Sequence, residues 1–332
     1  IICLSNIAML HFAYKKRSVP PPQAATRRCK ELWALLKRLT FPDGRLIRIG
    51  GDTRVRYCYC QDYCIPAWLL MNDLAGDLDC IRFEEEWLGL VRREMRANRD
   101  GSYLSSRCGE LASVSPLYYT RLEADRAVTL SMGAYWRRIF DLSSDRPADH
   151  DSEPKDFSWH DPFHGALLHR SPTRIVSWVW EAAEKPQGLC CVPDRSDLAE
   201  WRENCAAEIR GEGLLTTRDV LFREERRFQG GFLTWGRTAI NSRCMVAEGQ
   251  PDHDGCAEVS LVCAALPDNA TMIVLQQARA GKRRVCLTSV KGLHLLIPND
   301  IFNGNHRTYY AALMQHEIVG NADKEETVPL HS

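Results

Sequence analysis

The spacing of apolar residues over the first 141 positions predicts α-helices. Residues 62–74 are apolar almost all round, so we expect a buried helix there, with Pro66 in its first turns, where proline is tolerated. Further helices are expected at 24–39, 79–97 and 117–140, where apolar residues recur every three or four positions. Long helices joined by short turns are typical of helical hairpins stacked around a central axis.

The pattern changes after a polar linker at 142–158, which is rich in Asp, Ser and Pro. Beyond it, alternating apolar and polar positions predict strands at 174–182, 257–264, 271–277 and 284–288, with turn residues between them. The Gly230-Gly231 pair is interpreted as a strand bend. We therefore predict a multidomain α+β protein, with a helical domain at 1–145 and an antiparallel β domain at 158–332.

The balance of charges and the lack of a long apolar stretch argue against two classes of partner, nucleic acids and membranes. The chain has 332 residues with 43 basic and 43 acidic side chains, so its formal net charge is zero. A nucleic-acid or membrane-surface protein would need a basic excess, and no stretch is apolar enough to span a bilayer. We expect neither nucleic acid nor membrane as a partner.

The cysteine and glycine patterns point to no metal and no cofactor. Fourteen cysteines are present, but their spacing makes no zinc pattern. Cys58, Cys60 and Cys64 come closest and lack a paired motif or a nearby histidine ligand. Scattered buried thiols are therefore expected. No GxSxG, P-loop or Rossmann glycine pattern occurs.

The first residues resemble the end of a helix, because apolar positions precede Lys15, Lys16 and Arg17 and prolines follow. The chain does not begin with Met, so we interpret it as a fragment whose upstream part is missing. Both a cytoplasmic and a secreted location stay open, as does the oligomeric state.

Residues 42–63 carry the densest cluster of polar chemistry. A Gly50-Gly51 break is followed by Asp, Arg, Tyr and Gln side chains within twelve residues. Glycines allow close approach of the backbone to a ligand, and Arg forks and Tyr phenols suit carboxylates and sugar hydroxyls. The alternative is a helix N-terminus capped by Asp52 or Thr53, with the remaining side chains solvated.

Three further clusters follow. Residues 115–126 crowd Tyr118, Tyr119 and Arg121 at a helix start, and a surface ion pair with Asp125 is the alternative role for Arg121. Residues 159–172 contain three histidines, including His160 and His164, for which structural roles are the alternative to a site. Residues 297–310 are rich in Asn, Asp and Gly and favour a turn-rich connection between strands.

This layout resembles the heparinase II/III-like group of polysaccharide lyases and its alginate and hyaluronate lyase relatives. The matching pieces are PDGRLIRIGGDT at 42–53, the SPLYYTRLEADR helix, the WHDPFHG strand entry and GGFLTWGR at 230–237. Where those lyases more often carry another acidic residue after the aspartate, this chain has Thr53 and Arg54. The resemblance implies a partial (α/α) toroid followed by an antiparallel β-sandwich.

The resemblance also implies β-elimination of an acidic, uronate-containing polysaccharide. Such a lyase neutralises the sugar carboxylate, removes the adjacent ring proton and protonates the departing oxygen. Arg54 or Arg56 would hold the carboxylate. The catalytic candidates are Tyr57, Tyr118, Tyr119 and His160, and the substrate-binding candidates are Asp52, Arg54, Arg56, Gln61, Arg121 and His164.

Two other functions stay open. A glycoside hydrolase of the same architecture would need two carboxylates facing one bond, with Asp52, Asp62 and Glu123 as candidates. A non-catalytic carbohydrate-binding protein would keep aromatic side chains without an acid and a base in contact. In each case we expect the cleft between the two domains, with Arg54 or Tyr57 in one cavity with Tyr118 or His160.

Overall fold

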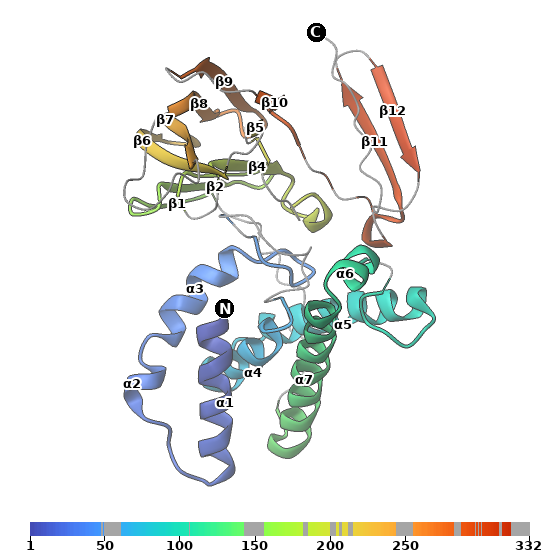
Figure 1. The fold of residues 1–332 in the computed structure, drawn as a ribbon. Helices are drawn as coiled ribbons and strands as arrows, with labels where there is room; N and C mark the ends of the chain where they lie inside the picture. The colour runs from blue at the N-terminus through green and yellow to red at the C-terminus, as the bar shows by residue number, and fades with distance from the viewer. Residues whose placement is uncertain are drawn as a thin grey trace. The chain divides into compact units, whose positions relative to one another are not determined.

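Helices precede antiparallel strands along the chain, so the protein has the α+β layout that the sequence predicts (Figure 1). The structure is a computed structural model and describes residues 1–47, 49, 61–105, 107–142, 156–181, 185–199, 204–205, 208–211, 215–243, 255–281, 287–295, 297, 299, 301–311 and 314–319. Contacts divide it into two units, one with α1–α7 and the β11–β12 hairpin, the other with β1–β10.

The helices are α1 (Ile2–Lys16), α2 (Gln23–Thr26), α3 (Cys29–Arg38), α4 (Cys64–Ala75), α5 (Asp79–Asn98), α6 (Gly109–Val114) and α7 (Pro116–Phe140). The expected helices at 62–74, 79–97 and 117–140 are confirmed by α4, α5 and α7. The single helix expected at 24–39 is instead divided into α2 and α3.

Helix α4 is the centre of the helical unit. Its residues from Cys64 to Asn72, including Trp68, are all buried, and the helix contacts α1, α3, α5 and α7. Gly76 ends the helix in a left-handed conformation (φ 63°), and its N–H donates to the carbonyl of Asn72. A non-glycine residue would be strained at this C-terminal position.

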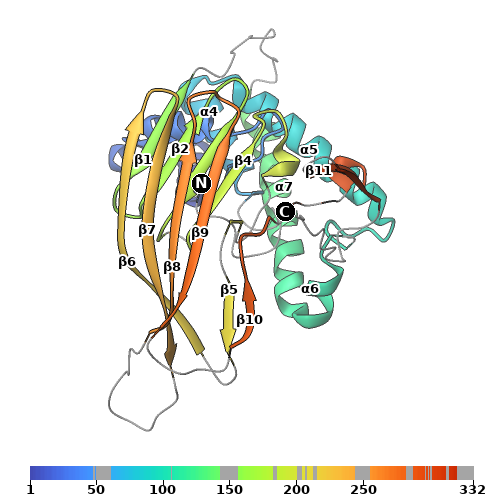
Figure 2. The same ribbon diagram turned by 90° about the horizontal axis from the view of Figure 1, so that it is seen from above.

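The strands are β1 (Phe157–Asp161), β2 (Ala166–Arg170), β3 (Ile175–Val179), β4 (Gln187–Cys191), β5 (Glu208–Gly211), β6 (Leu215–Phe228), β7 (Gly231–Arg243), β8 (Gly255–Ala265), β9 (Met272–Ala280), β10 (Leu287–Lys291), β11 (His306–Ala311) and β12 (Met314–Val319). All described pairings are antiparallel. One sheet has the order β1-β2-β3-β4 and another the order β6-β7-β8-β9, visible in Figure 2.

Residues of both four-stranded sheets enter one hydrophobic cluster. Trp178 of β3 and Phe232 of β7 are among its buried members. The predicted strands at 174–182, 257–264 and 271–277 correspond to β3, β8 and β9, and the last expected strand overlaps β10 only at 287–288.

The interpretation of Gly230-Gly231 as a bend was wrong, because the two strands reverse there. Phe228 of β6 pairs with Gly231 of β7, so residues 229–230 form a hairpin turn. Gly230 adopts φ 80°, a conformation that tight turns require and that glycine adopts without strain.

The C-terminal part of the described chain packs with the helices, although the expected β domain extended to residue 332. A 3₁₀ turn at Ile301–Asn303 carries Phe302, which packs against the helical core. The guanidinium groups of Arg45 and Arg107 lie 4.3 and 5.0 Å from the centre of its ring. These cation–π contacts attach the turn to the helical unit.

In the part of the chain that the structure describes, none of the helices has the length and apolar character that crossing a membrane requires.

Candidate functional site

The turn between β1 and β2 builds the most site-like arrangement in the β unit. Asp161 ends β1, and one of its carboxylate oxygens accepts the N–H of Phe163 at 2.9 Å. The other oxygen lies 2.5 Å from Nδ1 of His164. The hydrogen bond from His164 holds the pKa of the Asp161 carboxyl below its usual range. With Nδ1 bound to the carboxylate, Nε2 is the ring nitrogen left to exchange a proton.

Arg223 of β6 holds this turn in place. Its Nη2 donates to the carbonyls of Pro162 and Phe163, both at 2.9 Å, and its Nε donates to Glu181 at 2.7 Å. Gly165 follows the turn at φ 59°, and a Cβ there would lie 2.8 Å from Cδ of Arg223. The turn therefore depends on both a glycine and a buttressing arginine.

An exposed aromatic ring adjoins the Asp161–His164 pair. Phe163 is 80% exposed, and its ring meets that of His164 edge to face with centres 4.7 Å apart. The exposed ring offers an apolar face of the kind on which a sugar can stack.

A hollow of about 300 Å³ lies beside the turn and is lined by Pro162, Trp180, Arg223, Glu224, Glu225 and Thr234. Three of these lining residues are joined by hydrogen bonds. Trp180 Nε1 donates to the Thr234 hydroxyl, and that hydroxyl donates to the carbonyl of Glu224, both at 2.8 Å. The volume is at the lower end of the roughly 300–1,000 Å³ range of small-molecule sites.

His160 occupies a second position on β1, where its Nδ1 lies 2.9 Å from Nη1 of Arg227 on β6. In this contact the guanidinium donates and the imidazole nitrogen accepts. The third histidine of this segment, His169, is buried beside Arg174. Burial and then the Arg174 charge lower the pKa of His169, which gives it a structural place in the core.

The tyrosine cluster of α7 lies in the helical unit. Tyr118 and Tyr119 pack beside a small buried cluster, and the Tyr119 hydroxyl donates to Glu123 at 2.8 Å. The Glu123 carboxylate also accepts the N–H groups of Tyr103 and Leu104 at 2.9 Å each. Burial and then Glu123 raise the pKa of Tyr119 to about 12, so its phenol stays protonated at neutral pH.

Arg121 is exposed on α7 with Nε 3.6 Å from Asp125, which is the surface pair that the spacing allowed. Gln61 is fully buried instead of lining a surface. Its Nε2 donates to the carbonyl of Gly44 at 2.9 Å, and its Oε1 accepts the N–H of Leu46 at 3.2 Å. Its side chain therefore stabilises the Pro-Asp-Gly turn.

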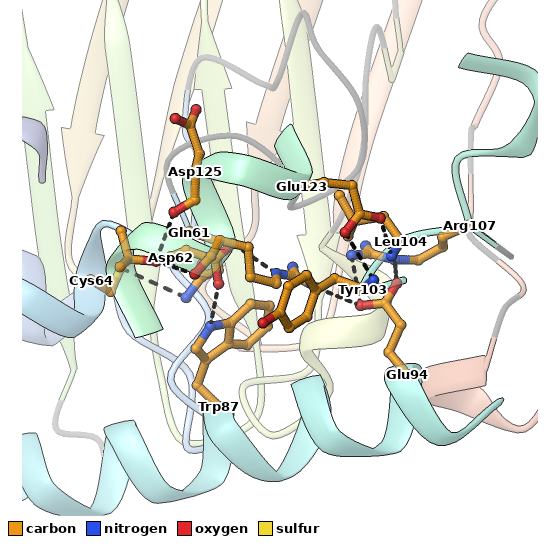
Figure 3. A network of polar contacts seen from close by, with 12 residues as sticks. Gln61, Asp62, Cys64, Trp87, Glu94, Tyr103, Leu104, Arg107, Glu123 and Asp125 are labelled. Atoms are coloured by element: carbon orange, nitrogen blue, oxygen red, sulfur yellow. Dashed lines mark hydrogen bonds and ion pairs between the residues drawn. The ribbon is translucent and has the colours of Figure 1, made fainter. Parts of the chain in front are cut away.

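A buried ionic network joins α5, α7, the residues just before α4 and the loop after α5, and sequence reasoning missed it. Arg126 donates to Asp62 at 2.9 Å and to Glu94 at 2.8 Å, and all three side chains are at most 6% exposed. Arg107 donates to Glu94 at 2.6 Å, and Trp87 Nε1 donates to Asp62 at 3.0 Å. Figure 3 shows Trp87 and Glu94 projecting from α5 toward Asp62 and Arg107.

Burial opposes ionisation of Glu94, but the charges of Arg107 and Arg126 outweigh it, so the pKa of Glu94 lies below its usual range. Glu94 therefore stays ionised between the guanidinium groups of Arg107 and Arg126 in the helical core. No motif signals this network, because its members are far apart along the chain and Glu94 has the spacing of a solvated helix position.

Asp52, Arg54, Arg56 and Tyr57 lie outside the described residues, and so does their predicted cavity with Tyr118 or His160. Tyr118 and Tyr119 belong to one unit, and His160 and His164 to the other. Among the described residues no group of three or more His, Cys, Asp or Glu side chains is arranged to hold a metal ion.

Comparison with known proteins found no matching family model, no matching curated protein and no matching solved structure.

Proposed function

We propose that the chain is a polysaccharide lyase that cleaves an acidic, uronate-containing polysaccharide by β-elimination. The observation that carries the proposal is the Asp161–His164 pair beside the exposed Phe163 ring and the hollow. The sequence resemblance to heparinase II/III-like lyases points the same way. The finer fold belongs to this proposal: a partial (α/α) toroid of α1–α7 and a sandwich of the two four-stranded sheets.

The proposed base is His164. Its Nδ1 is bound to Asp161, so Nε2 takes the proton next to the sugar carboxylate and the Asp161 carboxylate stabilises the imidazolium that forms. The electron pair released by this proton forms the new C=C bond as the glycosidic C–O bond breaks. The leaving oxygen receives a proton from a general acid, for which the sequence suggests a tyrosine.

The sugar needs a platform and a counter-charge. Phe163 supplies an exposed apolar face on which a pyranose ring can stack. Arg227 contributes a half-exposed guanidinium beside His160, although its Nε also lies 3.7 Å from the Glu225 carboxylate.

The test incubates the protein separately with polygalacturonate and with a neutral glucan. A lyase leaves an unsaturated uronate at each new end, which absorbs in the ultraviolet. New reducing ends without that absorbance would instead favour the hydrolase. Binding of polymer without any product would favour a non-catalytic carbohydrate-binding protein.

A further inference from the structure

Helix α5 carries a second feature that the proposed site does not use. Arg92, Arg93 and Arg96 are exposed and, with Gly89, line a hollow of about 340 Å³. Positions 89, 92, 93 and 96 are spaced by three or four residues, so they lie on one side of the helix. We call these four residues the α5 arginine surface.

The charges of this surface pair with no carboxylate of the described residues. In the ranges covered by the structure, none of the three guanidinium groups forms an ion pair with a carboxylate, and Arg92 donates through Nε to the carbonyl of Leu88 at 3.2 Å. The buried side of α5 is the reverse case, because Glu94 there meets Arg107 and Arg126. The exposed side of α5 therefore carries three arginines without a carboxylate partner in the described part of the chain, and the exposed Glu85 and Glu86 lie one turn before Gly89.

The helix dipole accounts for only one of the three arginines. Cations stabilise a helix through its last turn, and Arg96 is the basic residue in the last turn of α5. Arg92 and Arg93 lie further from the end. Two arginines therefore remain without a dipole or an ion-pair role.

Gly89 lies on the exposed side of α5, at the edge of the hollow. A glycine in the middle of a helix costs about 1 kcal/mol relative to alanine. Packing does not require this one, because no atom lies within 4 Å of the place a Cβ would take. The missing side chain leaves the hollow between the arginines open.

We infer that the α5 arginine surface binds an acidic polysaccharide chain through its carboxylates, as an auxiliary holding surface apart from the Asp161–His164 turn. Guanidinium forks match carboxylates, and a row of them suits a polymer that repeats its charge. The choice of a polyuronate as occupant rests on the proposed function.

The experiment measures binding of polygalacturonate to the full chain at low salt and again at high salt. The test variant is R92Q/R93Q/R96Q, and the matched control is R27Q/R28Q/K30Q, which removes the same charge from exposed positions at α2 and α3. We expect the test variant to bind about tenfold more weakly, since each exposed ionic contact contributes modestly, and the control to bind as the parent does. Equal losses in both variants, or no loss in the test variant, would overturn the inference.

A second variant separates binding from folding. G89A should raise the melting temperature by removing a helix glycine, yet weaken polygalacturonate binding by filling the hollow. Unchanged binding in G89A would contradict a role for the hollow. Equally tight, arginine-dependent binding of duplex DNA would show a general polyanion surface and overturn the assignment to polysaccharide.

The two proposals fail in different ways. Polymer binding that depends on the three arginines, without any unsaturated product, would remove the lyase proposal and leave the surface standing. Cleavage by the parent with unchanged binding in the triple variant would remove the surface alone.

Discussion

Replacing Arg126 by methionine should cost more stability than any surface change on the same helix. Arg126 is fully buried and bonds both Asp62 and Glu94. In R126M, Glu94 keeps Arg107, but Asp62 keeps only the Trp87 N–H and becomes a buried carboxylate without a counter-charge. Breaking a buried ion pair from one side costs about 3–5 kcal/mol, and we expect a loss in that range.

The control is R121M, which makes the same substitution on α7. Arg121 is 57% exposed and lies 3.6 Å from Asp125, so the expected loss is about 0–1 kcal/mol. Urea unfolding followed by tryptophan fluorescence and circular dichroism gives both free energies of unfolding.

A double variant tests the reason for the loss. In R126M/D62N the uncompensated charge is gone, while the amide oxygen can still accept the Trp87 N–H. The double variant should therefore be less destabilised than the sum of the two single changes. If R126M loses no more than R121M, or if the two changes simply add, the network does not stabilise the helical unit as argued.

Three further outcomes follow from the same geometry. Folding lowers the pKa of Glu94, so its carboxylate stabilises the protein above the usual Glu pKa of about 4.3, and this stabilisation is lost as the pH falls through the folded value. The difference in free energy of unfolding between the parent and E94Q, measured in urea, should therefore shrink on acidification. A difference that stays constant with pH would contradict the charged network. F163A should bind polygalacturonate about fivefold more weakly without loss of melting temperature, because covering an aromatic ring with a sugar contributes on the order of 1 kcal/mol. Equal binding curves for the parent and F163A would contradict a stacking role for Phe163. G165A should lower the free energy of unfolding by about 1–2 kcal/mol, because alanine is strained at φ 59° and its Cβ meets Arg223. An unchanged unfolding curve would show that the turn does not require glycine at this position.

Periodicity predicted the elements whose pattern is unbroken. The run of apolar residues around Trp68 indicated a buried helix, and α4 is that helix. Alternation likewise indicated β3, β8 and β9. The division of 24–39 into α2 and α3 and the reversal at Gly230 were missed, because leucine spacing does not mark a helix break and a glycine pair fits both a bend and a turn.

The sequence indicated which residues belong to the candidate site, but not which contacts they make. His160 and His164 were singled out from sequence, but their different partners, Arg227 and Asp161, depend on how β1 lies against β6 and on the turn that follows. Gln61 was interpreted as a ligand-facing amide, and its burial results from a turn closing over it. Contacts between residues far apart in sequence leave no local signal, which is why these details required the structure.

The most direct test of the central claim compares ultraviolet absorbance at the start of polygalacturonate digestion for the parent, H164A and H294A. His294 is a matched control, because it lies in the same unit and, among the described residues, its side chain makes a single polar contact, at 3.5 Å with the carbonyl of Gly292. The account predicts product with the parent and with H294A, and a rate at least about a hundredfold lower with H164A, the usual size of a general-base contribution. Product formation by H164A at the parent's rate would contradict it.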